Sequence, residues 1–145
     1  MTLPLPRVRV VAALITSEEG RRVLVQRRPP DGARPLLWEF PGGKVEPGES
    51  DAEALRREGR EELGVELAVG EERFRARHAY PELEVDLHLY QARVVAGRPR
   101  ATRGHLLREV TAAELAELPF CEADRPFVAA LVEEASEAAG RLLSG

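Results

Sequence analysis

Cysteine and lysine are almost absent from this chain of 145 residues, which has Cys121 as its only cysteine and Lys44 as its only lysine. A single cysteine cannot form a disulfide within the chain, so a reducing compartment such as the cytoplasm is expected. No apolar run approaches the ~20 residues that a membrane-spanning helix needs. Basic residues number 21 against 25 acidic ones, a formal net charge of −4. This balance argues against a strongly basic domain that binds duplex nucleic acid, because phosphate neutralisation needs clustered positive charge.

The rest of the composition is that of an ordinary globular protein. Hydrophobic residues make up 43% of the chain and charged residues 32%, which is too apolar for a disordered segment. A chain of this length can bury one core, and it contains no internal repeat, low-complexity tract or linker. We therefore predict a single domain over residues 1–145.

Apolar patterning predicts strands and helices that are interspersed along the chain. Strands are expected at 7–15, 23–26 and 84–90. Helices are expected at 51–63, 111–118 and 123–143, the first capped by Ser50 or Asp51. The strand at 84–90 alternates strictly, which predicts one solvent-exposed face and places His88 on it. The pattern indicates a mixed α/β domain.

Three glutamates in the helix expected at 51–63 carry the first chemical signal. Glu58, Glu61 and Glu62 are spaced i, i+3 and i+4, which places three carboxylates on one face of an α-helix. Like charges at this spacing repel, and solvent, nearby arginines or a divalent cation can offset the repulsion. Clustered carboxylate oxygens are ligands that Mg²⁺ and Mn²⁺ prefer. Taken alone, the same spacing also fits a solvated helix face.

Two features just before this helix favour a metal site over a solvated face. Gly42 and Gly43 allow the backbone to approach a ligand closely. Glu49 adds a fourth carboxylate where the loop meets the helix.

The segment 43–65 resembles the Nudix box. That motif is Gly, five residues, Glu, seven residues, Arg-Glu, a bulky apolar residue, any residue, Glu-Glu, any residue, Gly and an apolar residue. The residues in register are Gly43, Glu49, Arg57, Glu58, Glu61, Glu62, Gly64 and Val65. Gly59 departs from the motif, because it stands where a bulky aliphatic residue is usual. Glycine inside a helix costs up to ~1 kcal/mol relative to alanine, and we expect a core contact to be lost there.

The resemblance implies a fold, an enzyme class and a set of roles. It implies an α/β/α sandwich with a mixed central sheet and a catalytic loop–helix–loop, in a hydrolase of phosphoric anhydride bonds. Glu58, Glu61 and Glu62, with the backbone carbonyl of Gly42, would bind Mg²⁺ or alternatively Mn²⁺. Arg57 would pair with Glu49 or orient a glutamate. Water would be activated by one of the three glutamates or by a loop residue, and the sequence does not decide between them.

Residues outside the box resemble the MutT-like nucleoside triphosphate pyrophosphohydrolases of this family. The segment 37–44 resembles their approach to the box, and Arg27-Arg28 resembles the basic pair that ends their second strand. The implied substrate-binding residues are Arg28 for phosphate, Phe40 for the base, Asp124 for the base edge, and Lys44. Without the resemblance, Arg28 fits a surface arginine, Phe40 a core aromatic and Asp124 a helix cap.

One position outside the box does not fit this subgroup. Its members often carry a further loop glutamate, a candidate metal ligand or base, before the short helix. By spacing, Arg103 holds that place, and the nearest acid is Glu109. The number of metals and the identity of the general base therefore stay open.

The activity implied by the resemblance is metal-dependent hydrolysis of a (deoxy)nucleoside triphosphate to monophosphate and pyrophosphate. An oxidised purine triphosphate such as 8-oxo-dGTP is the favoured substrate, followed by a pyrimidine triphosphate. Such an activity would give the protein a role in nucleotide pool sanitisation. Hydrolysis of ADP-ribose or a dinucleoside polyphosphate is the alternative within the family. A non-catalytic nucleotide sensor is the alternative outside it, favoured by Gly59 and Arg103 and opposed by the intact glutamates. We expect a monomer or homodimer without nucleic acid or membrane partners.

Overall fold

A computed structural model describes residues 4–102 and 104–144 of the chain. Its strands are β1 (Arg7–Ile15), β2 (Val23–Arg27), β3 (Trp38–Glu39), β4 (Gly42–Lys44), β5 (Glu66–Ala79), β6 (Glu84–Ala96) and β7 (Leu106–Val110). Its helical elements are α1 (Asp51–Glu58), the π-helical segment η1 (Gly59–Leu63), α2 (Ala112–Glu117), the 3₁₀ turn η2 (Glu122–Asp124) and α3 (Arg125–Ser144). Within the described ranges, no helix is both long enough and apolar enough to cross a bilayer.

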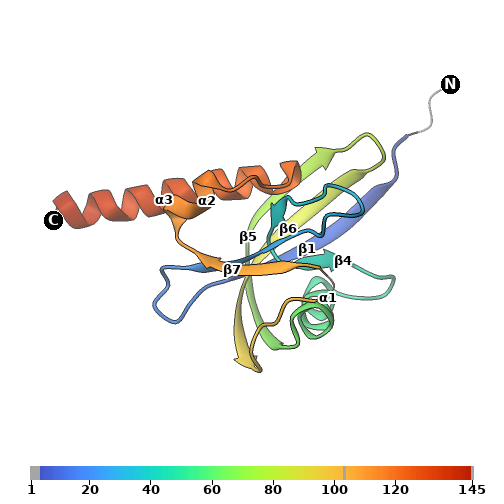
Figure 1. The fold of residues 1–145 in the computed structure, drawn as a ribbon, viewed down its shortest axis with the longest axis horizontal. Coiled ribbons are helices and arrows are strands. Elements are labelled where there is room, and N and C mark those ends of the chain that lie inside the picture. The colour runs from blue at the N-terminus through green and yellow to red at the C-terminus, as the bar shows by residue number, and fades with distance from the viewer. Residues whose placement is uncertain (1–3, 103, 145) are drawn as a thin grey trace.

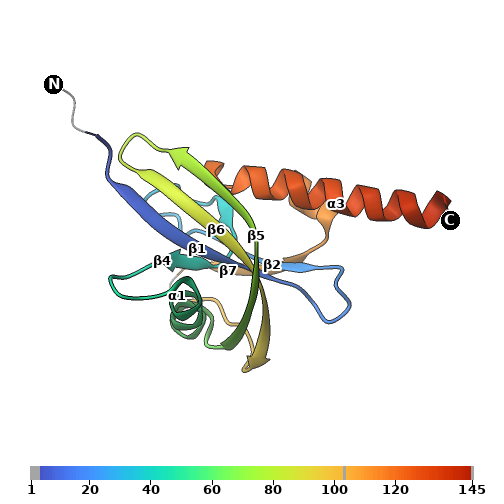
Figure 2. The same cartoon turned by 180° about the vertical axis from the view of Figure 1, so that it is seen from behind.

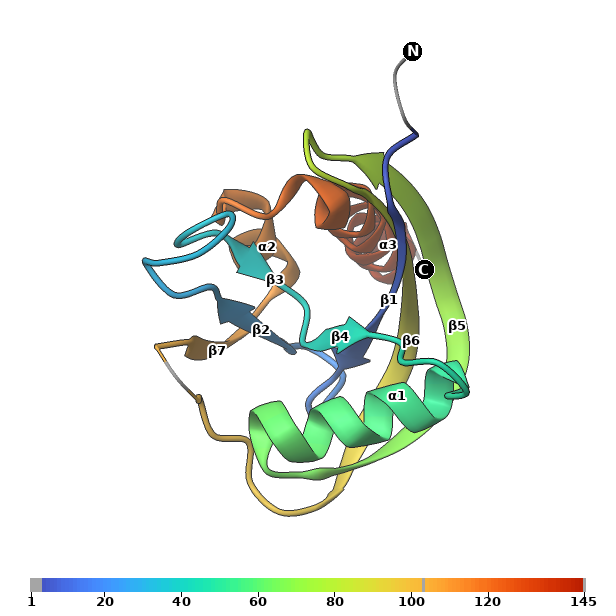
Figure 3. The same cartoon turned by 90° about the vertical axis from the view of Figure 1, so that its right-hand side faces the viewer.

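The strands form two sheets that lie between helices. One sheet has the order β4-β1-β6-β5 and the other β3-β2-β7. The β1–β6 pair is parallel and the other pairs are antiparallel, so the sheet structure is mixed, as the sequence implies. Figure 3 shows α1 on one side of the strands and α3 on the other. The predicted three-layer α/β/α arrangement is confirmed, with its strands divided between two sheets.

Strand β1 is apolar throughout its second half because both of its faces are covered. Val11, Ala13 and Ile15 belong to the core cluster beneath α1. The alternate residues Ala12 and Leu14 belong to a second cluster, which includes Phe127 of α3. The two opposite faces of β1 thus pack against two hydrophobic layers. Strand β4 pairs with one edge of β1, and the chain continues from β4 into α1.

Helix α1 starts at a capping box. The Ser50 hydroxyl accepts a hydrogen bond from the Glu53 backbone N–H, and the Glu53 carboxylate accepts one from the Ser50 backbone N–H, both at 3.1 Å. Ser50 is therefore the cap, and Asp51 serves another purpose. The Asp51 carboxylate receives two hydrogen bonds from the Arg9 guanidinium, at 2.8 and 2.7 Å, and one from the Tyr90 hydroxyl. These contacts fasten the first turn of α1 to strands β1 and β6.

Replacing Asp51 by asparagine should cost about 2 kcal/mol of folding stability at neutral pH. The Arg9 hydrogen bond holds the pKa of Asp51 down at about 2, against an ordinary value of 3.8. A carboxyl with a depressed pKa stabilises the fold above its unfolded pKa, and that stabilisation disappears as the pH falls from about 4 to about 2. Urea unfolding of both proteins at pH 7 and pH 2.5 measures the difference. An equal difference at both pH values would contradict the argument.

Several sequence-based expectations for the strands were incomplete. Strands β3, β4, β5 and β7 were not anticipated, and β6 continues from Tyr90 to Ala96. Strand β5 contains many arginines and glutamates and has no clear alternation of apolar residues. Its conformation is set by pairing with β6 along most of its length, a tertiary effect that local propensity does not reveal.

The predicted position of His88 on an exposed face was wrong. Its side chain is only 4% exposed. Its Nδ1 lies 2.5 Å from a Glu72 oxygen, and its Nε2 lies 3.1 Å from an Asp86 oxygen. Two flanking carboxylates give the ring polar partners inside the protein, which is why a polar residue on an alternating strand is buried here.

Candidate active site

A cleft of about 590 Å³ brings together residues from both sheets and from the segment that follows α1. The cleft is lined by these residues that the motif and the resemblance singled out: Arg28, Phe40, Gly42, Gly43, Lys44, Glu62 and Asp124. They come from four separate parts of the chain. Figure 1 shows α1 beside β4, where the chain enters the helix. The cleft thus joins the predicted metal-binding side of the site to the predicted substrate-binding side.

The two glycines before α1 are required by close approach. A β-carbon on Gly42 would lie 2.0 Å from the Val11 carbonyl oxygen of the paired strand β1. A β-carbon on Gly43 would lie 2.4 Å from the carboxyl carbon of Glu58. At Gly42 the clash would be with backbone atoms, whereas at Gly43 the Glu58 carboxylate would have to move aside. The Glu58 carboxylate therefore lies directly against the backbone of the turn, as the sequence argument for these glycines anticipated.

Arg57 is the centre of the ion-pair network in the loop–helix–loop. Its Nε and Nη2 donate to the two oxygens of Glu49, at 2.7 and 2.9 Å. Its Nη1 donates to Glu58 at 2.8 Å and to Glu61 at 3.1 Å. A fifth hydrogen bond runs from Nη2 to the Lys44 carbonyl. The structure thus has Arg57 paired with Glu49 and in contact with two glutamates, which combines the two roles that the resemblance offered for it.

The three box glutamates are neighbours, but they differ in environment. The Glu58 side chain is 14% exposed and the Glu61 side chain 60% exposed, although both contact the same Arg57 nitrogen. Glu62 points toward β2, where its Oε2 accepts a hydrogen bond from Gln26 at 3.1 Å. The helix is not regular over these residues, because α1 gives way to the π-helical η1 at Gly59. The wider turn changes the side-chain directions that an ideal α-helix would give.

Burial and mutual repulsion raise the pKa values of two of these glutamates. Loss of hydration raises the pKa of Glu58. Burial, and then the charge of Glu58, raise the pKa of Glu62 to about 8. A cation placed between the two carboxylates would relieve both effects.

The donor set suits a hard divalent cation in chemistry. Carboxylate oxygens and a backbone carbonyl are ligands that Mg²⁺ accepts. In the part of the chain that the structure describes, however, no three acidic, histidine or cysteine side chains converge closely enough to hold a metal ion. Glu58 and Glu62 are both partly buried, and the charge of Glu58 acts on Glu62, whereas Glu61 is exposed. The Glu61 side chain is 60% exposed, so it would have to turn inward to join them at a metal ion.

The expected loss of a core contact at Gly59 was wrong. A β-carbon on Gly59 would lie 2.8 Å from Cδ1 and 2.9 Å from Cγ of Leu67. Leu67, the second residue of β5, is itself buried within the core beneath α1. The bulk that the motif usually supplies from the helix is supplied here from the neighbouring strand, so Gly59 is a packing requirement and not a defect.

Replacing Gly59 by leucine, the kind of residue usual in the motif, should destabilise the protein by ~1–3 kcal/mol through overpacking against Leu67. Leu67→Ala alone should cost ~2–5 kcal/mol through the cavity it leaves. The double variant should be more stable than the sum of the two costs predicts, because the new leucine fills that cavity. Urea unfolding of all four proteins measures the coupling. Additive costs would show that the two side chains do not compete for the same space.

On the substrate side of the cleft, Arg28 is partly buried instead of lying on the surface. Its Nη1 donates to Glu39 at 2.8 Å, and its Nε donates to the Ala33 carbonyl at 2.9 Å. Glu39 also lines the cleft, and burial raises its pKa against the opposing effect of Arg28. Sequence analysis assigned no role to Glu39. Glu39 pairs with Gln26 across β2 and β3, and no motif in the sequence reveals this register.

Phe40 and Asp124 meet at the far wall of the cleft. Phe40 is 2% exposed and packs against Phe120, with ring centroids 5.4 Å apart, so it is a core aromatic that also lines the cleft. The Asp124 carboxylate accepts a hydrogen bond at 3.2 Å from the Phe40 backbone N–H, across 84 positions of sequence. Burial, and then the charge of Glu39, raise the pKa of Asp124 to about 8. The bond to Phe40 gives Asp124 a partner outside its own helix, unlike a helix cap.

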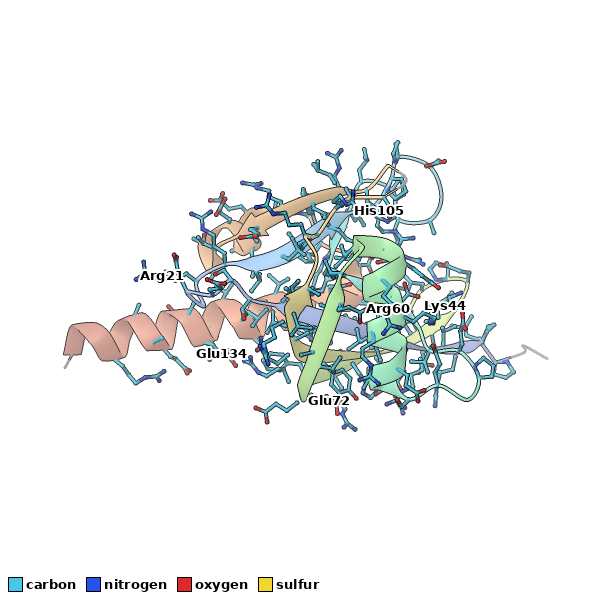
Figure 4. The ribbon with its side chains drawn as sticks, turned by 90° about the horizontal axis from the view of Figure 1, so that it is seen from below. Arg21, Lys44, Arg60, Glu72, His105 and Glu134 are labelled. Carbon is cyan, nitrogen blue, oxygen red and sulfur yellow. The ribbon has the colours of Figure 1, made fainter. Side chains whose placement is uncertain are left out.

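The remaining candidates are divided between the cleft and other surfaces. Lys44 is exposed and lies beside the helical segment that carries Arg60 (Figure 4). His105, also labelled there, lines the same cleft from the loop before β7. Arg103 lies outside the described residues. Glu109 lines a different groove, with Arg22 and Arg93, and so does not replace the missing loop acid.

The geometry and the motif together define a hydrolase site of the Nudix kind, and comparison with known proteins agrees. The NUDIX domain family model matches residues 11–130, and the chain belongs to this family. The predicted enzyme class and MutT-like fold are therefore confirmed. The chain is 36% identical over 125 residues to CTP pyrophosphohydrolase of Escherichia coli, covering 86% of this chain and 91% of that protein. It is 40% identical over 131 residues to putative 8-oxo-dGTP diphosphatase 2 of Mycobacterium tuberculosis, covering 84% and 86%.

Solved structures show the same likeness. The solution structure of the E. coli ORF135 protein matches with a TM-score of 0.72 and 35% identity, over 93% of this chain and 94% of that one. The crystal structure of the MutT protein from Methanosarcina mazei Go1 matches with a TM-score of 0.80 and 27% identity, over 92% and 99%. Both matches span nearly the whole chain.

Proposed function

We propose that this Nudix hydrolase converts nucleoside triphosphates to monophosphate and pyrophosphate, with an oxidised purine triphosphate such as 8-oxo-dGTP as the favoured substrate. The observation that carries the proposal is the cleft that joins Glu62 and the Gly42–Lys44 turn to Arg28, Phe40 and Asp124. Its volume falls within the range of small-molecule sites. The names of the E. coli and M. tuberculosis relatives support a nucleoside triphosphate as substrate.

Glu58, Glu61 and Glu62, with the Gly42 carbonyl, would hold Mg²⁺, or Mn²⁺ in its place. The bound cation would supply neutralisation of phosphate charge and a lower pKa for water. Arg28 lines the same cleft as Glu62 and would add positive charge to the phosphate chain. A water oxygen forms the new bond to phosphorus, the bond to the departing pyrophosphate breaks, and a carboxylate of the cluster takes up the water proton.

Asp124 would read the base edge from the far wall. Its raised pKa keeps most of the carboxyl protonated at pH 7, so it can donate one hydrogen bond and accept others. That pattern can match both an oxo group and an N–H group on a purine. Phe40, next to it, would form part of the wall against which the base lies.

An Asp124→Asn variant should change the substrate ranking while the fold persists. The amide oxygen can still accept the Phe40 N–H, whereas its NH₂ cannot titrate and offers two donors. We expect the ratio of kcat/KM between 8-oxo-dGTP and dGTP to change about tenfold, the worth of ~1.4 kcal/mol of discrimination. The melting temperature should move by only about 2–4 °C. A lower melting temperature with an unchanged ranking would assign Asp124 a purely structural role.

Pyrophosphate release from a nucleotide panel tests the proposal as a whole. The panel contains 8-oxo-dGTP, dGTP, dCTP, CTP, ADP-ribose and a dinucleoside tetraphosphate, each with Mg²⁺ and with chelator. We expect metal-dependent pyrophosphate release from a triphosphate, with 8-oxo-dGTP used best. Turnover of ADP-ribose or the tetraphosphate alone would overturn the substrate assignment, and nucleotide binding without turnover would favour a sensor. A role in nucleotide pool sanitisation in the cytoplasm, as a monomer or homodimer, belongs to the same proposal.

A further inference from the structure

Gln26 is a buried polar residue that neither the motif nor the cleft accounts for. It lies in the middle of β2, is 2% exposed, and is not among the residues that line the cleft. Strand β2 is the central strand of its sheet, and Gln26 pairs with Glu39 on one side and Leu107 on the other. Its backbone is therefore held from both sides. A buried amide in such a place needs a hydrogen-bond partner, because an unsatisfied one costs free energy.

The partner of the Gln26 amide is Glu62. Gln26 Nε2 donates to Glu62 Oε2 at 3.1 Å. Residue 24, two positions earlier on the same face, is a leucine that packs into the apolar core beneath α1. Leu24 and Gln26 thus lie on the same face of β2. The side chains on this face change from apolar at Leu24 to polar at Gln26, which contacts the Glu62 carboxylate. A leucine or methionine of similar size would leave Glu62 without this donor.

Glu62 is also fixed from its backbone side. The Thr102 hydroxyl donates to the Glu62 carbonyl at 3.1 Å. The segment that carries Glu62 ends at Gly64, whose left-handed conformation (φ 69°) turns the chain away. The main chain is therefore anchored by the loop before β7, and the side chain is held by Gln26 of β2. Among the three box glutamates, Glu62 is the one that lines the cleft.

We propose that Gln26 is a positioning residue that holds the Glu62 carboxylate in place for a divalent cation. The inference rests on the proposed metal site. Gln26 touches neither the cleft nor the reacting atoms, so it acts through Glu62. Removing a side chain that orients a metal ligand in this way commonly lowers metal affinity or activity by roughly ten- to a hundred-fold.

The test is Mn²⁺ binding to the protein without nucleotide, measured by electron paramagnetic resonance for wild type, Gln26→Met and Gln26→Asn. Methionine keeps the length and volume of the side chain but removes the donor, and asparagine keeps the donor but is one methylene too short. We expect the Mn²⁺ dissociation constant to rise about tenfold or more in both variants. With a triphosphate substrate, kcat should fall ~10–100-fold, and KM should change less than about threefold, because Gln26 does not contact the nucleotide.

Gln91→Met is the matched control. Gln91 lies on β6, donates to the Leu14 carbonyl and the Thr16 hydroxyl, and accepts a hydrogen bond from Arg73. Its replacement also removes a partly buried amide, and it should lower the melting temperature without altering the Mn²⁺ dissociation constant.

An unchanged Mn²⁺ affinity in Gln26→Met, or an equal loss in Gln91→Met, would overturn the inference. Wild-type protein that binds no Mn²⁺ would overturn it together with the metal site. If wild type binds Mn²⁺, Gln26→Met weakens that binding, and no triphosphate of the panel is hydrolysed, the positioning role stands and only the proposed substrate class fails.

Discussion

A Glu62→Gln variant should lose about three orders of magnitude in kcat and at the same time become more stable without metal. The amide has the shape of the carboxylate but cannot supply a negative ligand. Because a cation at phosphate contributes several kcal/mol to transition-state stabilisation, losing a ligand has a large effect on kcat. The gain in stability follows from the raised pKa of Glu62, about 8 against an ordinary 4.5. Between these values the unfolded chain ionises first, so ionisation of Glu62 favours unfolding.

The stability gain should therefore grow as the pH rises from about 4.5 to about 8, to the order of a few kcal/mol, and then level off. Urea unfolding in chelator at pH 5, 7 and 8.5 measures it, and pyrophosphate release with Mg²⁺ measures kcat. Glu66→Gln is the control, because Glu66 is half-exposed and pairs with Arg60. A stable but fully active Glu62→Gln protein would remove Glu62 from the metal site.

Arg57→Met should impair both catalysis and folding. The side chain is 21% exposed and gives hydrogen bonds to three carboxylates and the Lys44 carbonyl. Methionine retains much of the apolar stem but leaves Glu49 and Glu58 partly buried without their cation. We expect a loss of about 2 kcal/mol in stability, between the values for exposed and fully buried pairs. The kcat should fall about a hundredfold, because Glu58 loses the group that orients it.

Arg60→Met, three residues further along, separates this effect from a general loss of positive charge. The Arg60 side chain is 57% exposed and pairs with Glu66 alone among the described contacts. Its loss should alter stability only slightly and leave kcat unchanged. Thermal unfolding and steady-state kinetics of the two variants provide the comparison. Equal effects at positions 57 and 60 would contradict the central role of Arg57.

Local rules predicted the elements whose signals are local. The helix starting after Ser50 follows from a capping box within four residues, and β1 follows from an apolar run. Strand β5 was not predicted, and His88 on the paired strand β6 was predicted on the wrong face. Both depend on pairing and charge neutralisation between segments distant in sequence. The π-helical η1 was likewise not predictable from an i, i+3, i+4 pattern, which assumes a regular α-helix.

The candidate site shows the same division. Motif spacing identified Glu49, Arg57 and the three glutamates, and the structure brings Arg57 into contact with Glu49, Glu58 and Glu61. The contacts of Gln26 and Leu67 with the helical segment were not predictable, since each comes from a strand with no recognisable motif. The Leu67 side chain packs against Gly59 and leaves no room for a larger residue there. This contact explains why glycine replaces the bulky residue of the motif, which the sequence alone presents as a defect.

The bonds between the Trp38–Phe40 region and the end of the chain have a consequence for the order of folding. Trp38 donates its N–H to Pro119 and accepts from Cys121, and Phe40 donates to Asp124. These contacts close a loop of about eighty residues, whereas Arg57 and Glu49 are eight positions apart. Closing long loops costs more chain entropy and delays assembly. During synthesis on a ribosome, the residues of the proposed metal site emerge early. The base-binding wall can form only when the chain has been made as far as the start of α3. Figure 2 shows the far end of that helix extending beyond the sheets.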